Sequence, residues 1–175
     1  DVYKRQDYYD WFPQNNSLYV AVGDATGHGM TAGMMVSITK AGLMGTPPHI
    51  PPNEVTYGLN RTIKSIDLGK NKMAISIARF WEDRVEFTSA AMPPIYHYKS
   101  ETNEVDEILL EGLPLGSFKG ETYSLLSVET KPGDAYVFIS DGLPEATNIS
   151  EKMLGYKAVL ECIKNNGKNL SLIHI

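Results

Sequence analysis

The stretch AVGDATGHGMTAGMMVSI, residues 21–38, joins an apolar run to an aspartate and then to a glycine-rich turn containing a histidine. The residues SLYVAVGD (17–24) are rich in β-formers and follow Asn-Asn-Ser, so they predict a strand that ends at Asp24. A carboxylate at the end of an apolar strand costs free energy unless another group compensates its charge. Asp24 is therefore either a binding residue or, in the simpler interpretation, the cap of the helix that follows.

Two helices are predicted after this stretch. The first runs from Gly29 to about Met44 and Gly45 predicts its end, and its apolar residues at helical spacing are Met30, Met34, Ile38 and Ala41. The proline-rich connector TPPHIPP (46–52) follows. The second helix is predicted from the apolar stripe formed by Val55, Leu59, Ile63 and Ile66.

Strands dominate the rest of the chain. Hairpins are predicted over 73–92 and 95–110, further strands over 122–130 and 135–141, and a last helix from about Ser150 to Asn165. The strand ending at Asp141 repeats the pattern Tyr-Val-x-x-x-Asp of the strand ending at Asp24. This order of elements predicts an α+β fold in which helices pack on antiparallel sheets.

Composition restricts the function classes. The length of 175 residues suits one domain with a substantial core, and the net charge of −5 argues against nucleic acid or an anionic membrane as the main partner. Apolar runs are too short to predict a membrane span. The single cysteine, Cys162, excludes an internal disulfide and a cysteine-based zinc cluster, and fits a cytoplasmic protein.

The two ends of the chain look foreign. DVYKRQ at the start and LSLIHI at the end can be encoded by the two strands of one inverted repeat, which resembles a transposon end used to prepare sequencing libraries. We therefore interpret 1–6 and 170–175 as sequencing-library scars and expect one domain over 7–169, cut at both ends. The alternative is a native edge strand at each end.

The aspartates suggest metal chemistry. Hard cations such as Mg²⁺ and Mn²⁺ prefer carboxylate, carbonyl and water ligands. Asp24 and Asp141 are the leading candidates, and Asp7 and Asp10 of DYYDWF form a further acidic pair. The small residues after Asp24 let the backbone approach a metal or a phosphate, and the amides at the following helix start favour an anion. The simpler interpretation of Asp141 is that it opens a turn.

Five motifs carry a family resemblance, which covers nearly all of residues 7–165. They are DYYDWF (7–12), GDATGHGMTAGMM (23–35), FTSAAMPPIYHY (87–98), GLPLGSF (112–118) and VFISDGLPEATN (137–148). In this order they resemble the SpoIIE/RsbU-like branch of the metal-dependent serine/threonine protein phosphatases, the PPM family. The resemblance implies a β-sandwich of two mainly antiparallel sheets flanked by helices in α-β-β-α layers. It also implies two Mn²⁺ or Mg²⁺ ions that activate water for in-line attack on phosphoserine or phosphothreonine.

The resemblance assigns roles to particular residues. Asp24 would bridge the two metals, the backbone carbonyl of Ala25 would bind the second, and Asp141 would bind the first. Asp7 would act through metal-bound water or in the shell around the ligands. His28 would shape the loop or lie near the phosphate, with a general-acid role as the weaker alternative. The residues that would shape the loops and favour the phosphate are Gly27, Gly29 and Gly142.

Three departures from the family pattern stand out. Arg5-Gln6 replaces a Gly-Gly pair before Asp7, which the terminal scar explains. Met92 stands where the family commonly has a histidine, and we expect it to be a packing residue. No aspartate follows Asp141, although the family usually supplies another metal-binding Asp near its C-terminus, so the chain as written is expected to lack a complete first metal site.

The function implied by the resemblance is a phosphoprotein phosphatase of bacterial signalling. Its substrate would be a phosphorylated regulator such as an anti-anti-sigma factor, an upstream sensor or receiver domain would regulate it, and the resemblance also allows a homodimer through the first two helices. The alternative is a catalytically silent pseudophosphatase that binds its partner. A nucleotide-phosphate loop is a third hypothesis, but GDATGHGMTAG lacks the Lys-Ser/Thr ending of a P-loop.

Overall fold

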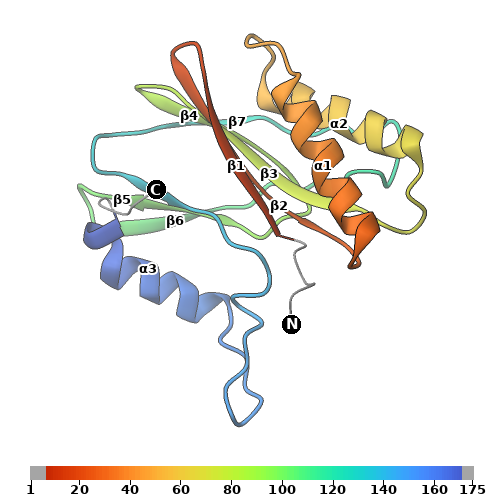
Figure 1. Cartoon of the computed structure of the whole chain (residues 1–175). Coiled ribbons are helices and arrows are strands. Elements are labelled where there is room, and N and C mark those ends of the chain that lie inside the picture. Colours follow the sequence, from red (N-terminus) through yellow and green to blue (C-terminus); the bar gives the residue numbers. More distant parts are fainter. Residues whose placement is uncertain (1–6, 171–175) are drawn as a thin grey trace. The chain divides into compact units, whose positions relative to one another are not determined.

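The computed structural model describes residues 7–170, which form two units, each described below by itself. The predicted scars at 1–6 and 170–175 lie outside this range except for residue 170. The first unit contains a five-stranded antiparallel sheet in the order β1-β2-β3-β4-β7, with two helices (Figure 1). Its elements are β1 (Asp7–Gln14), β2 (Ser17–Ala25), α1 (Met30–Met44), α2 (Pro52–Ile66), β3 (Met73–Phe80), β4 (Arg84–Ala90) and β7 (Leu126–Glu129).

Both helices of the first unit pack on one face of this sheet. Along β2 the alternate residues from Ser17 to Ala25 are buried, whereas the residues between them are partly exposed. The buried set belongs to a core shared with the helices, whose largest members include Tyr19, Met35, Leu43, Ile63, Met73, Ile75, Ile77 and Leu115. Because strand side chains alternate between the two faces, Asp24 lies on the face away from the helices.

The buried face of α1 differs from the predicted one. Met30 is 83% exposed and Met34 is 46% exposed, and the residues of α1 that face the core are Ala32, Met35, Thr39 and Leu43. The prediction missed this face because it contains a polar residue, Thr39. Thr39 is fully buried, and its Oγ1 donates a hydrogen bond to the carbonyl of Met35 at 2.9 Å. A polar residue in the core stripe hides that stripe from a search for apolar periodicity.

The second unit is a three-stranded antiparallel sheet in the order β6-β5-β8 with one helix. Its elements are β5 (Ile95–Lys99), β6 (Glu104–Ile108), β8 (Ala135–Val137) and α3 (Tyr156–Leu170). The helix packs on this sheet through a core made of Tyr96, Tyr98, Ile139, Val159 and Ile163.

A buried aspartate joins β5 to the turn before β8. Asp134 accepts hydrogen bonds from the backbone nitrogens of Ser100 (2.9 Å) and Lys131 (3.1 Å), and its Oδ2 lies 3.0 Å from Nε2 of His97. The ring of His97 stacks on Tyr136. Burial alone would raise the pKa of Asp134, but the hydrogen bonds from Ser100, His97 and Lys131 lower it. This network fixes the entry to β8, and so the segment that leads to Asp141.

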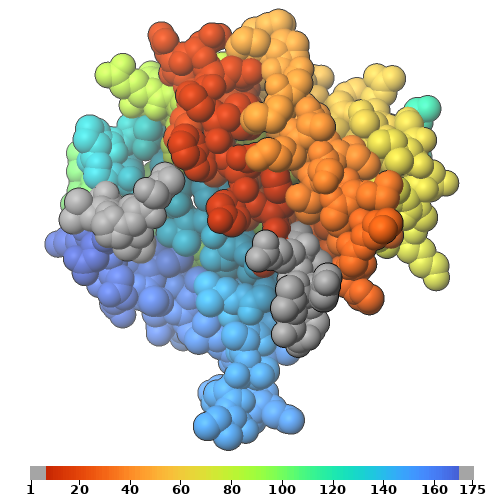
Figure 2. Space-filling model, viewed as in Figure 1, coloured from red at the N-terminus to blue at the C-terminus, as the bar shows by residue number. Residues whose placement is uncertain are grey.

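The segment between Asp141 and α3 projects from the second unit as a long loop (Figures 1 and 2). Its two arms are joined by a bridge between Thr147 and Met153, and by a hydrogen bond from the amide of Gly155 to the carbonyl of Pro144 at 2.8 Å. The loop occupies part of the predicted last helix, which therefore begins at Tyr156 rather than near Ser150.

The predicted fold class, α+β with two antiparallel sheets flanked by helices, is confirmed. Most predicted elements are present, but β8 ends at Val137 instead of reaching Asp141, and β7 begins only at Leu126. Strand β1 was not predicted. That residues 7–169 form one domain stays a prediction. Over the described residues, none of the helices combines the length and the apolar character that crossing a membrane requires.

Candidate functional site

Two aspartates meet at one end of the first sheet. Strand β1 pairs with β2 so that Asp7 is the direct partner of Asp24. Cβ atoms of directly paired residues are about 4.5–5.5 Å apart and lie on the same face of the sheet. Asp7 is exposed, Asp24 is partly buried, and the Oδ1 atom of Asp24 is shielded from solvent. Like charges placed opposite each other are destabilising in a sheet, so this pair favours a bound cation.

Gly23 allows β2 to pack closely on β3 directly before Asp24. A Cβ atom on Gly23 would lie 2.6 Å from the carbonyl oxygen of Ala74 and 2.7 Å from the side chain of Met73. The neighbouring strand β3 therefore leaves no room for any side chain directly before Asp24. Gly23 is required because the backbones of β2 and β3 lie close together there, and not because of its φ, which is outside the left-handed region.

Hydrogen bonds to Lys72, the residue before β3, fix the turn after Asp24. The amide of Thr26 donates to the carbonyl of Lys72 (2.9 Å), and the amide of Lys72 donates to Oγ1 of Thr26 (2.8 Å). Gly27 (φ +88°) and Gly29 (φ +75°) have backbone conformations that favour glycine, and their loop-shaping role near a phosphate stays a prediction. His28 lies exposed between them. No local pattern predicts the contact between Thr26 and Lys72, because the two residues lie 46 positions apart in the sequence.

The start of α1 suits an anion. Its cap is Gly29, which provides no side-chain hydrogen bond to the first turn, and that turn carries no acidic residue. Backbone N–H groups at a helix start carry partial positive charge and bind phosphate where no side chain competes.

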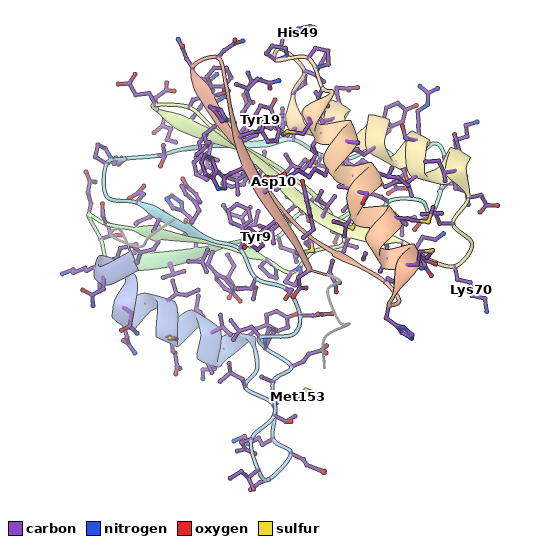
Figure 3. The ribbon with its side chains drawn as sticks, in the orientation of Figure 1. Tyr9, Asp10, Tyr19, His49, Lys70 and Met153 are labelled. Atoms are coloured by element: carbon purple, nitrogen blue, oxygen red, sulfur yellow. The ribbon has the colours of Figure 1, made fainter. Side chains whose placement is uncertain are left out.

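Asp10 does not join the acidic pair. It is the strand partner of Ala21, so it lies on the helix-covered face, opposite to that of Asp7 and Asp24. There its Oδ2 lies 3.0 Å from Nζ of Lys40 and accepts a hydrogen bond from the hydroxyl of Tyr8. Figure 3 labels Asp10 on β1. Burial alone would raise the pKa of Asp10, but hydrogen bonds from Lys40, Tyr8 and the backbone of Trp11 lower it. Asp10 therefore joins β1 to α1.

Asp141 belongs to the second unit. It lies exposed in the turn after β8, where its carbonyl accepts a hydrogen bond from the amide of Glu145 at 3.0 Å. Gly142 has neither a left-handed φ nor a close neighbour, since a Cβ there would lie 3.8 Å from Oγ of Ser140. The backbone therefore does not require glycine at 142, in contrast to positions 27 and 29.

The side chains at this end of the first sheet offer the type of donor atom, oxygen, that a hard divalent cation binds. Two carboxylates from paired strands, together with the backbone carbonyls of the turn that follows, are oxygen donors of the kind that Mg²⁺ and Mn²⁺ prefer. Within residues 7–170 the structure brings together no group of three or more Asp, Glu, His or Cys side chains suited to a metal. Asp7 and Asp24 would therefore form only part of a ligand set, which backbone carbonyls and water would have to complete.

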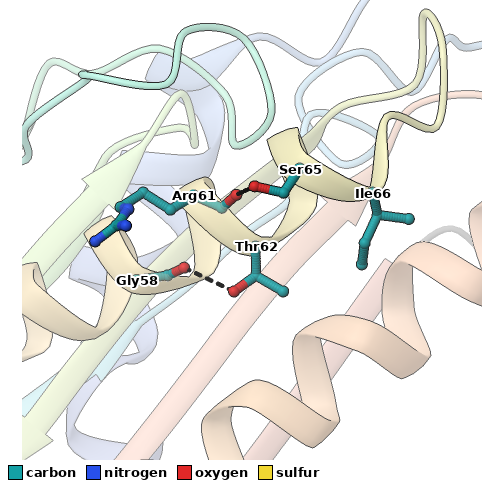
Figure 4. Close-up of a pocket in the computed structure, with 5 residues that line it drawn as sticks. All are labelled: Gly58, Arg61, Thr62, Ser65 and Ile66. Atoms are coloured by element: carbon teal, nitrogen blue, oxygen red, sulfur yellow. Dashed lines mark hydrogen bonds between the residues drawn. The ribbon is translucent and has the colours of Figure 1, made fainter.

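Two pockets of the first unit lie along α2, away from the predicted site residues. One of about 440 Å³ is lined by Gly58, Arg61, Thr62, Ser65 and Ile66 (Figure 4). A second, of about 260 Å³, shares Gly58 and Thr62 with it and extends to the end of α1. None of the predicted site residues lines either pocket.

Met92, which takes the place of a family histidine, is 6% exposed, as expected for a packing residue.

Comparisons with known proteins agree with the motifs. The family model for Stage II sporulation protein E (SpoIIE) matches residues 14–174. The phosphoserine phosphatase RsbU of Bacillus subtilis (strain 168) is 28% identical over 142 residues, which cover 79% of this chain and 42% of RsbU. The chain therefore spans less than half the length of this curated relative.

Solved structures show the same fold. The SiaA-PP2C domain of Pseudomonas aeruginosa matches 95% of this chain and 68% of its own with a TM-score of 0.78 and 17% identity. The structure of RsbX in complex with magnesium matches 95% of this chain and 80% of its own with a TM-score of 0.67 and 16% identity. With a family model that matches most of its residues and the fold of PP2C domains, the chain belongs to the SpoIIE family, in the RsbU-like branch of the PPM phosphatases.

Proposed function

We propose that this chain is a metal-dependent protein serine/threonine phosphatase domain that removes phosphate from a phosphorylated regulator. The observation that carries the proposal is the pairing of Asp7 with Asp24 at the end of β2, directly before a glycine-rich turn and an uncapped helix start. The family and the activity of the relative RsbU, a phosphoserine phosphatase, support it.

Each part of this arrangement has a task in the proposed reaction. Asp24 would bind two Mn²⁺ or Mg²⁺ ions together with the carbonyl of Ala25, and Asp141 would be a further ligand. Asp7 would act through metal-bound water or in the shell around the ligands. Bound divalent ions supply Lewis-acid charge at a phosphoryl group. Gly27 and Gly29 keep the turn compact, and the N–H groups of the first turn of α1 would bind phosphate oxygens. His28 is exposed beside them and would contact the phosphate or shape the loop.

The wider setting is also part of the proposal. The chain spans 42% of RsbU, which fits an upstream sensor or receiver domain in the parent protein. The substrate would be a small phosphoserine protein of the anti-anti-sigma type in the cytoplasm, and a homodimer through α1 and α2 stays a prediction. The alternative is a pseudophosphatase that binds its partner without hydrolysis.

The test is phosphate release from a phosphoserine protein, with and without Mn²⁺, by the chain and by the longer protein that carries it. We expect release that depends on Mn²⁺ and is abolished by Asp24→Asn. The matched control is Asp10→Asn, on the paired strand but on the opposite face, which should retain release. If folded protein binds Mn²⁺ and releases no phosphate, the pseudophosphatase is correct.

A further inference from the structure

A buried asparagine on α2 reaches across to a distant loop. Asn60 is fully buried, and both ends of its side-chain amide are used. Oδ1 accepts a hydrogen bond from the amide of Gly116 (2.8 Å), and Nδ2 donates to the carbonyl of Phe118 (2.8 Å). A buried amide that satisfies two backbone groups of another segment fixes that segment strongly, since loss of the amide leaves both groups unpaired.

The loop that Asn60 holds is closely packed against α2 at Gly116. Gly116 has φ +85°, and a Cβ there would lie 2.9 Å from the side chain of Ile63 on the same helix. The preceding residue, Leu115, is fully buried and exchanges two hydrogen bonds with Met73, in which each amide donates to the other's carbonyl (2.8 and 3.2 Å). Asn60 therefore fixes the segment that pairs with the first residue of β3.

From Met73 the contacts continue to the proposed metal ligands. Met73 is the strand partner of Ala25. The carbonyl of the preceding Lys72 accepts a hydrogen bond from the amide of Thr26, and the amide of Lys72 donates one to Oγ1 of Thr26. The side chain of Asn71 packs beneath Gly27, where a Cβ would lie 3.1 Å from its amide nitrogen. The loop before β3, whose Lys70 is labelled in Figure 3, thus lies between the segment held by Asn60 and the turn after Asp24.

We propose that Asn60 is a positioning residue for the proposed metal site. It fixes the position of Leu115 and Gly116, and Leu115 pairs with the first residue of β3. The start of β3 in turn fixes the position of Asp24 and Ala25 at the end of β2. Asn60 contacts neither ligand, so it acts only through this chain of backbone hydrogen bonds. The inference rests on the proposed function where it concerns metal, and on the structure alone where it concerns the end of β2.

Its test compares two residues of equal burial on α2. In Asn60→Ala both backbone partners lose their hydrogen bonds. In the control, Thr56→Val, a fully buried hydroxyl is lost whose Oγ1 bonds only to Pro52 of its own helix, at 2.9 Å. Amide hydrogen exchange is measured at Thr26 and Met73 in the metal-free chain, and Mn²⁺ binding is measured by calorimetry.

We expect faster exchange at both amides and roughly tenfold weaker Mn²⁺ binding in Asn60→Ala, within the range seen when residues supporting metal ligands are removed. Neither change is expected in Thr56→Val, because its backbone partner lies on the same helix. Exchange at Thr26 and Met73 that matches the control overturns the proposal, as does unchanged Mn²⁺ affinity. If the wild-type chain binds no Mn²⁺, the proposed function fails, and the exchange result still decides the positioning role.

Discussion

The substitution Gly23→Ala tests whether close packing of β2 on β3 positions Asp24. The added Cβ would lie 2.6 Å from the carbonyl oxygen of Ala74, whereas ordinary contacts begin near 3.4 Å. The two strands must therefore separate by about 0.8 Å at this point, and overpacking of this kind costs about 1–3 kcal/mol. Because the obstacle is backbone and not a side chain end, rotamer changes cannot relieve it. The displaced residue is the neighbour of Asp24, so we expect weaker Mn²⁺ binding as well.

The assay is urea unfolding followed by tryptophan fluorescence, together with a Mn²⁺ titration. Gly33→Ala is the matched control, because a Cβ at this exposed position of α1 meets nothing within 4 Å. Replacing a helical glycine by alanine is expected to stabilise the protein by about 0.5–1 kcal/mol. If Gly23→Ala changes the free energy of unfolding by less than about 0.5 kcal/mol, below the expected cost of overpacking, and leaves Mn²⁺ binding unchanged, the packing argument is wrong.

Three further predictions concern individual carboxylates. Against the raising effect of burial, hydrogen bonds from Ser100, His97 and Lys131 lower the pKa of Asp134 below the ordinary value of an aspartate. Its contribution to stability is therefore complete above that ordinary value and is lost as the pH falls through the lower folded pKa. Asp134→Asn should therefore reduce the difference in stability between pH 7 and acid, measured by urea unfolding at each pH. Lys40→Ala breaks a partly exposed ion pair with Asp10 and should cost only about 0.2–1 kcal/mol, a loss that shrinks in high salt. Asp141→Asn should abolish Mn²⁺-dependent phosphate release and leave the melting temperature nearly unchanged, because the side chain is exposed; normal release by this variant would remove Asp141 from the ligand set.

Local patterns were sufficient for much of the first unit. Strand β2 and the end of α1 at Gly45 were predicted from sequence, because a short apolar run of β-forming residues and a terminal glycine are local signals. The β3–β4 hairpin was predicted for the same reason. Strand β1 was missed because it is an edge strand with Pro13 and with aromatic and acidic residues on both faces, which obscures alternation.

Non-local contacts account for what the sequence could not predict about the site. The pairing of Asp7 with Asp24 depends on β1, and nothing in DYYDWF marks Asp7 rather than Asp10 as the residue on the same face. Asn60 resembles any polar residue of an amphipathic helix, since its partners are 56 and 58 residues away along the chain. The role of such residues is fixed by tertiary packing, which a single sequence does not display.

The most direct test of the central claim is the number and affinity of Mn²⁺ ions bound by the chain, with Asp24→Asn beside the wild type. We predict that the wild type binds Mn²⁺ and that Asp24→Asn, still folded by circular dichroism, loses at least one ion while Asp10→Asn binds as the wild type does. Equal stoichiometry and affinity in the wild type and Asp24→Asn would contradict the account, because the aspartate at the end of β2 would then hold no metal.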